Sequence, residues 1–129
     1  MKSLIRAAAG SFAARSGALS AFERAARGAL AVLCYHRVLP EAERARYHTP
    51  DLVVTPETLR AHCRILAERY TVAPLGTALA AWQRGEVSDR PLVAITFDDG
   101  YRDNIRYAAP ILRAHGLRAT FYIIAGLVD

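Results

Sequence analysis

Short apolar runs alternate with amphipathic stretches along the chain, and this pattern predicts alternating strands and helices. Four apolar runs have the length of a strand, at residues 30–35, 71–73, 92–97 and 119–124. The first run is continuously apolar, which is typical of a strand that is covered on both faces, as in a parallel sheet. The repeated order of strand, helix and strand predicts an α/β fold with a parallel sheet or barrel.

Capping residues mark the helices between these strands. Thr55 is suited to an N-cap, with Pro56 at the first helical position. We expect this helix to run to about residue 69. Its buried side should hold Leu59, Cys63, Leu66 and Tyr70. A second helix is expected from about residue 76 to 85, and a third between Pro110 and Gly116. Residues 40–50 are polar and are predicted to form a loop.

The first 28 residues have a basic amphipathic pattern. They hold five of the 17 basic residues of the chain but only one acid, Glu23. On a helix their large apolar side chains fall within an arc of about 100°, with the basic residues opposite and Arg15 as the exception. We therefore separate a basic leader helix, residues 1–28, from a second unit, residues 29–129. Such a helix can contact an anionic membrane surface, pack on the following domain or serve as an organelle presequence.

Composition narrows the class of protein. A chain of 129 residues with 53% hydrophobic and 22% charged residues can form one small domain with a core. The chain after residue 28 is nearly neutral, which argues against a nucleic-acid partner. No apolar run is long enough to span a membrane, and Arg6 and Arg15 interrupt any signal-peptide core. A cytoplasmic or membrane-peripheral location is slightly favoured, with the cell envelope as the alternative. Cys34 and Cys63 fit no metal or disulfide spacing and are predicted to be buried free thiols.

A pair of carboxylates, Asp98 and Asp99, follows the strand at residues 92–97. In parallel α/β folds, reactive groups gather at the carboxyl ends of strands. Adjacent strand residues point to opposite faces, so both carboxylates can share one site only if the chain bends, and Gly100 allows such a bend. The alternative is a simple hairpin turn, but the residues that follow do not alternate as a second strand would.

The sequence around this pair resembles the first motif of the polysaccharide deacetylases, carbohydrate esterase family four. The match consists of Thr-Phe-Asp-Asp-Gly-Tyr at 96–101, followed in order by Pro-Ile-Leu at 110–112, Gly-Leu at 116–117 and Ala-Thr-Phe-Tyr at 119–122. Leu-Cys-Tyr-His-Arg-Val at 33–38 resembles the start of many such domains. The resemblance covers about residues 30–129.

The resemblance implies an irregular (β/α) barrel, of which this chain would hold the N-terminal portion. It implies metal-dependent hydrolysis of N-acetyl groups on an amino-sugar polymer or oligosaccharide. Asp98 would be the catalytic general base and Asp99 a ligand of a divalent metal, zinc being expected and other divalent metals remaining open. A metal acidifies its bound water, and a neighbouring carboxylate can accept the water's proton. His36 would neighbour the active site, with a purely structural histidine as the alternative.

The chain departs from the family pattern after Asp99. The family takes two further metal ligands from a downstream pair of histidines, whereas His115 is the one histidine that follows Asp99 in this chain. We expect His115 to interact with the carbonyl end of its own helix. Four strands are about half of such a barrel. We therefore expect a fragment that cannot deacetylate alone; the alternative is a catalytically incomplete remnant or a membrane-surface binding module. A magnesium phosphatase is disfavoured because its aspartates are usually separated by one residue. His48 and His62 are predicted to be surface residues.

Overall fold

A four-stranded parallel sheet forms the centre of the computed structural model, which describes residues 18–86 and 88–127. Its strands are β1 (Leu30–Tyr35), β4 (Thr71–Val72), β5 (Leu92–Phe97) and β6 (Thr120–Phe121). β5 pairs with β1 along its whole length, and its other edge pairs with β4 near its start and with β6 near its end. The prediction of an α/β fold with a parallel sheet is therefore confirmed, and β1 and β5 have the predicted bounds.

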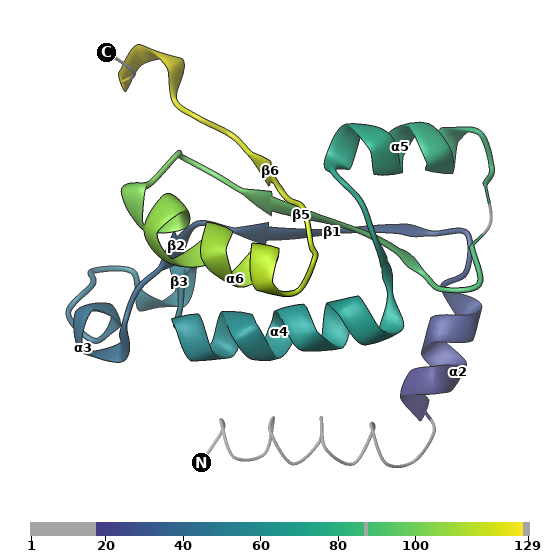
Figure 1. Cartoon of the computed structure of the whole chain (residues 1–129), viewed down its shortest axis with the longest axis horizontal. Helices are drawn as coiled ribbons and strands as arrows, with labels where there is room; N and C mark the ends of the chain where they lie inside the picture. Colours follow the sequence, from purple (N-terminus) through teal and green to yellow (C-terminus); the bar gives the residue numbers. More distant parts are fainter. Residues whose placement is uncertain (1–17, 87, 128–129) are drawn as a thin grey trace.

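Helices connect the strands and lie on both faces of the sheet. They are α4 (Pro56–Arg69), α5 (Leu75–Gln83) and α6 (Ala109–Ala114), the last preceded by a π-helical turn, η2 (Asn104–Ala108). The chain moves across the sheet in one direction from β1 to β4 and from β5 to β6, but in the opposite direction from β4 to β5. Since crossover connections are right-handed, α4 and α6 share one face and α5 lies on the other, as Figure 1 shows.

The core lies between the sheet and the helices α4 and α6. Alternate residues of β5 point into it, namely Val93, Ile95 and Phe97. The helices add Leu59, Cys63, Leu66, Ile111 and Leu112. The Phe97 ring stacks between the rings of Tyr35 and Phe121, at centroid distances of 5.3 and 5.0 Å. The helix after Thr55 is confirmed, because the Thr58 amide donates a 3.1 Å hydrogen bond to the Thr55 hydroxyl.

The prediction that β1 is covered on both faces is wrong. Val32 is 48% exposed and Cys34 is also exposed, whereas the opposite side chains of the strand pack toward α4. In the described part of the chain, β1 pairs only with β5, so it is an edge strand. The apolar run thus predicted the strand but not its surroundings, because a run of this kind does not specify which neighbours are present.

Other elements also differ from the prediction. The segment 40–50 is not entirely a loop, since it contains a short helix, α3 (Glu41–Arg44), and the start of a 3₁₀ turn, η1 (Pro50–Leu52). A small parallel pair, β2 (Arg37–Val38) and β3 (Val53–Val54), encloses this segment. β6 has two residues rather than six, and the chain then runs to a final 3₁₀ turn, η3 (Ala125–Leu127).

The predicted leader helix is described only in part. Residues 1–17 lie outside the described residues, and α2 (Ala18–Ala25) covers the rest of the helical signal. Glu23 of α2 forms an ion pair with Arg69 at the end of α4, with Arg69 Nε donating to Glu23 Oε1 at 2.8 Å. Among the described residues, no helix has the length and apolar character needed to cross a membrane.

Candidate active site at the carboxyl end of the sheet

The pleat of two neighbouring strands brings Cys34, His36 and Asp98 to one face. Cys34 lies opposite Thr96 in the register of β1 and β5, and His36 and Asp98 are each two residues further along. The Asp98 amide donates a 2.9 Å hydrogen bond to the Tyr35 carbonyl, so the pairing continues past the strand ends. Alternate residues share a face, and these three side chains therefore point away from α4.

The Asp98 carboxylate has two close neighbours on this face. Cys34 Sγ donates a hydrogen bond to Asp98 Oδ2 at 3.1 Å, and His36 Nε2 lies 3.9 Å from the same oxygen. Partial burial, followed by the hydrogen bond to Asp98, raises the pKa of the Cys34 thiol. The thiol is thus protonated at neutral pH and acts as a donor. The prediction that Cys34 is a buried free thiol is wrong, whereas Cys63 is free and buried as predicted.

A tight turn follows Asp98 and bends the chain as expected. Asp99 and Gly100 both have positive φ angles, 67° and 64°. Aspartate is among the few residues that tolerate this region, and glycine adopts it readily. A Cβ atom at Gly100 would lie 3.0 Å from the Ile123 side chain, so Ile123 would have to shift, and the positive φ would strain any other residue at this position. Because of the bend, Asp98 and Asp99 line the same hollow, together with residues 122–124.

An ion pair fixes the chain directly after His36. Arg37 Nε donates to both carboxylate oxygens of Asp103, at 3.1 and 3.2 Å. The Val38 amide donates to Asp103 Oδ2 at 2.7 Å, and the Asp103 side chain is only 7% exposed. The Arg37 guanidinium also lies over the rings of Tyr47 and Tyr101, 4.8 and 4.1 Å from their centroids. This network was not predicted from the sequence, since nothing in the pattern connects residues 66 positions apart.

The remaining histidines lie away from this cluster. His62 was predicted to be a surface residue but is half-buried, and its Nδ1 lies 3.0 Å from the Tyr35 hydroxyl on the α4 side of the sheet. Burial raises the pKa of Tyr35 to about 12, so this hydroxyl keeps its proton. His115 Nδ1 contacts the Ile111 carbonyl at 2.9 Å at the end of α6, as expected. His48 is exposed, as predicted.

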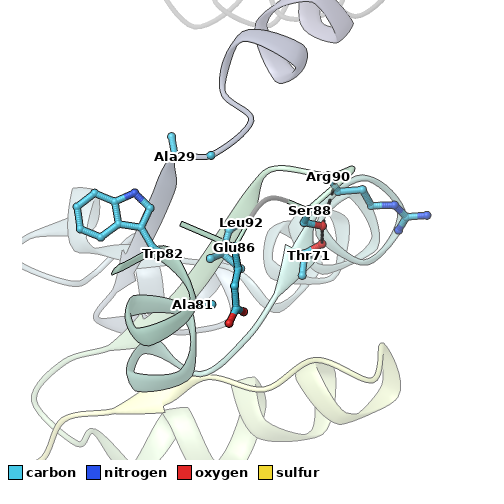
Figure 2. Close-up of a pocket in the computed structure, with 9 residues that line it drawn as sticks. Ala29, Thr71, Ala81, Trp82, Glu86, Ser88, Arg90 and Leu92 are labelled. Atoms are coloured by element: carbon cyan, nitrogen blue, oxygen red, sulfur yellow. Dashed lines mark hydrogen bonds between the residues drawn. The ribbon is translucent and has the colours of Figure 1, made fainter. Parts of the chain in front are cut away.

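A second hollow lies at the opposite end of the sheet (Figure 2). It is lined by residues at the amino ends of β1, β4 and β5, including Ala29, Thr71 and Leu92, and by Trp82 of α5. Its polar contacts include a 2.9 Å hydrogen bond between the hydroxyls of Thr71 and Ser88. The carboxylate pair is at the other end of β5, so the candidate active site is the hollow beside Asp98 and Asp99.

Comparison with known proteins shows which proteins this chain is similar to. Residues 85–129 match the polysaccharide deacetylase family. The chain is 36% identical over 76 residues to YxkH of Bacillus subtilis (strain 168), a protein assigned to the polysaccharide deacetylases; the match covers 57% of this chain and 27% of YxkH. The predicted resemblance to the polysaccharide deacetylase family is therefore confirmed.

Two solved structures are similar to this chain as well. The Streptococcus pyogenes deacetylase PplD, solved in complex with acetate, is 27% identical with a TM-score of 0.64, over 76% of this chain and 43% of PplD. The polysaccharide deacetylase BC0361 from Bacillus cereus is 26% identical with a TM-score of 0.58, over 78% of this chain and 31% of BC0361. The chain thus spans about a quarter of YxkH and less than half of either structure.

Proposed function

We propose that the protein containing this chain hydrolyses N-acetyl groups on an amino-sugar polymer or oligosaccharide, with Asp98 as the general base. The observation that carries this proposal is the position of Asp98, at the carboxyl end of the central strand β5 and inside the segment that matches the family. Its side chain is 35% exposed and borders an open hollow, so a substrate can reach it. PplD was solved with acetate, which is the product that such a reaction releases.

The residues around Asp98 support its role as a proton acceptor. Cys34 and His36 both lie next to one carboxylate oxygen of Asp98, Oδ2. None of the described residues donates a hydrogen bond to Oδ1, which leaves this oxygen available to a water molecule. A carboxylate within hydrogen-bond distance of the attacking water can accept its proton. His36 then neighbours the base, with its Nε2 3.9 Å from Asp98 Oδ2.

Asp99 is proposed as one ligand of the divalent metal that the family implies, zinc being expected. Catalytic zinc sites use three protein ligands and leave one position open for water. Asp99, however, belongs to no group of three metal-ligating side chains within residues 18–86 and 88–127. The residues of this chain therefore do not by themselves fit a catalytic metal at Asp99. We propose that residues 29–129 are part of an irregular (β/α) barrel whose other segments complete the site.

The alternative of a non-catalytic membrane-surface module is not favoured, because the similar proteins are deacetylases. Contact between residues 1–28 and an anionic membrane stays a prediction. A vesicle-binding measurement on this segment tests it separately.

Acetate release from N-acetylglucosamine oligosaccharides tests the proposed activity. The protein isolated from its native cells should release acetate, and Asp98→Asn should lower kcat about 100-fold or more with little change in KM. Asp51→Asn is the matched control, because Asp51 is exposed and lies outside the site. The 129-residue chain with added zinc or cobalt should stay at the background rate. An Asp98→Asn variant with nearly full activity would refute the assignment of the base.

A further inference from the structure

The cluster at the carboxyl end of β1 combines three different metal-ligating groups. A thiol, an imidazole and a carboxylate, from Cys34, His36 and Asp98, have ligand atoms that all lie within 4.8 Å of one another. It is the one such group of three in the part of the chain that the structure describes. Thiolate and imidazole ligands favour zinc over magnesium or calcium. A carboxylate completes a common zinc ligand set.

We propose that Cys34, His36 and Asp98 together bind a thiophilic divalent cation, such as Zn²⁺, at a site that does not include Asp99. This site goes beyond the proposed function, because the metal that the family implies would be bound through Asp99. The two sites differ chemically: the one at Asp99 offers oxygen alone in this chain, whereas the cluster offers sulfur, nitrogen and oxygen.

Two of the three separations between the ligand atoms are close to those that the ion needs. Tetrahedral zinc, with bonds of about 2.0 to 2.3 Å, separates its ligand atoms by roughly 3.3 to 3.6 Å. Here the sulfur lies 3.1 Å and the imidazole nitrogen 3.9 Å from Asp98 Oδ2. Rotation of side chains at the ends of the strands can provide the remaining shift. The thiol proton, now donated to Asp98, would be released when the metal binds.

The surroundings of the three side chains allow a cation to reach them and do not repel it. Cys34 is exposed, and the side chains of His36 and Asp98 are 31% and 35% exposed, so a cation can enter and water can occupy the fourth position. The nearest cationic side chain along the chain, Arg37, is already engaged by Asp103. A metal at this position would occupy the carboxylate that we propose as the base, and would therefore oppose its role.

Cobalt titration of the purified 129-residue chain tests this proposal without any measurement of catalysis. We expect one equivalent of Co²⁺ to bind with a thiolate-to-cobalt charge-transfer band in the near ultraviolet. Cys34→Ser should abolish the band, and His36→Ala or Asp98→Asn should weaken binding at least about tenfold. Two matched controls, Cys63→Ala and Asp99→Asn, should retain it. A band that survives Cys34→Ser, or that disappears in Asp99→Asn, would overturn the proposal.

A measurement on the unaltered chain covers the case in which a variant fails to fold. Saturating Zn²⁺ should slow the alkylation of Cys34 by iodoacetamide at least about tenfold, as followed by peptide mass spectrometry. An unchanged rate would count against the site. If the chain binds cobalt but the native protein releases no acetate, the proposed function fails and the metal site stands; the reverse result rejects only the metal site.

Discussion

Removal of the Asp103 carboxylate should destabilise the chain more than any exposed substitution, because two donor groups, Arg37 Nε and the Val38 amide, depend on it. In Asp103→Ala, Arg37 loses two hydrogen bonds to the carboxylate and the Val38 amide loses one of 2.7 Å. Breaking one partner of a buried ion pair typically costs about 3 to 5 kcal/mol. The Arg37 side chain is still 18% exposed and can turn toward water, so we place the loss near the lower limit, at about 3 kcal/mol.

Urea unfolding followed by far-ultraviolet circular dichroism measures this loss. For a chain of this size, about 3 kcal/mol corresponds to a decrease of roughly 10 to 15 °C in Tm. Asp51→Ala is the control, since an exposed aspartate without such partners should change stability by less than about 0.5 kcal/mol. If Asp103→Ala costs less than about 1 kcal/mol, the carboxylate is not the anchor that we describe, and the chain after His36 is fixed by other contacts.

Three further changes test the packing and the ion pairs. Thr55→Ala should lower the free energy of unfolding by about 1 kcal/mol, because it removes the hydroxyl that accepts the Thr58 amide. Phe97→Ala should cost about 3 to 5 kcal/mol, since its ring is fully buried between two aromatic rings. Arg69 lowers the pKa of Glu23 below its ordinary value of 4.5. The stabilisation from this pair should therefore be complete above pH 4.5 and decline as the pH falls through the lowered pKa. Glu23→Gln should flatten that decline in Tm measured against pH.

Matched variants separate these specific effects from a nonspecific loss of stability. Thr55→Ser keeps the capping hydroxyl and should unfold like the unaltered chain, whereas an equal loss in both variants would rule out the cap. Ile105→Ala removes an apolar side chain that is 69% exposed, so it should have little effect beside Phe97→Ala. A pH profile of Tm that is identical with and without the Glu23 carboxylate would show that the ion pair contributes nothing measurable.

The elements that are defined by local signals could be predicted from the sequence. β1 and β5 have the expected bounds because their apolar runs end at strongly polar residues, and the Thr55-Pro56 pair marks the start of α4. The bend after Asp98 could be foreseen from Gly100, although the positive φ begins one residue earlier, at Asp99. Parallel pairing followed from the alternation of strands and helices. The choice of the strand end as the active site stays a prediction.

The contacts that join distant parts of the chain could not be predicted in this way. Cys34 looked like a core residue because its neighbours are apolar, yet its position opposite Thr96 places it beside Asp98, 64 residues away. The Arg37–Asp103 pair has the same character. The short β2–β3 pair contains too few residues to show a period of two, so its pattern carries almost no signal. The strand β6 was expected, but its apolar run did not show that only two of its residues pair with β5.

Because of the position of Trp82, the tryptophan fluorescence of the chain reports on one end of the sheet only. It is the one tryptophan of the sequence, and it lines the hollow at the amino ends of the strands (Figure 2). β5 has six residues, which separate that end from Asp98 by about 20 Å. The emission of Trp82 should thus change when α5 loosens from the sheet and stay constant when a ligand binds beside Asp98. Fluorescence and a probe attached to Cys34 would therefore report independently on the two ends of one sheet.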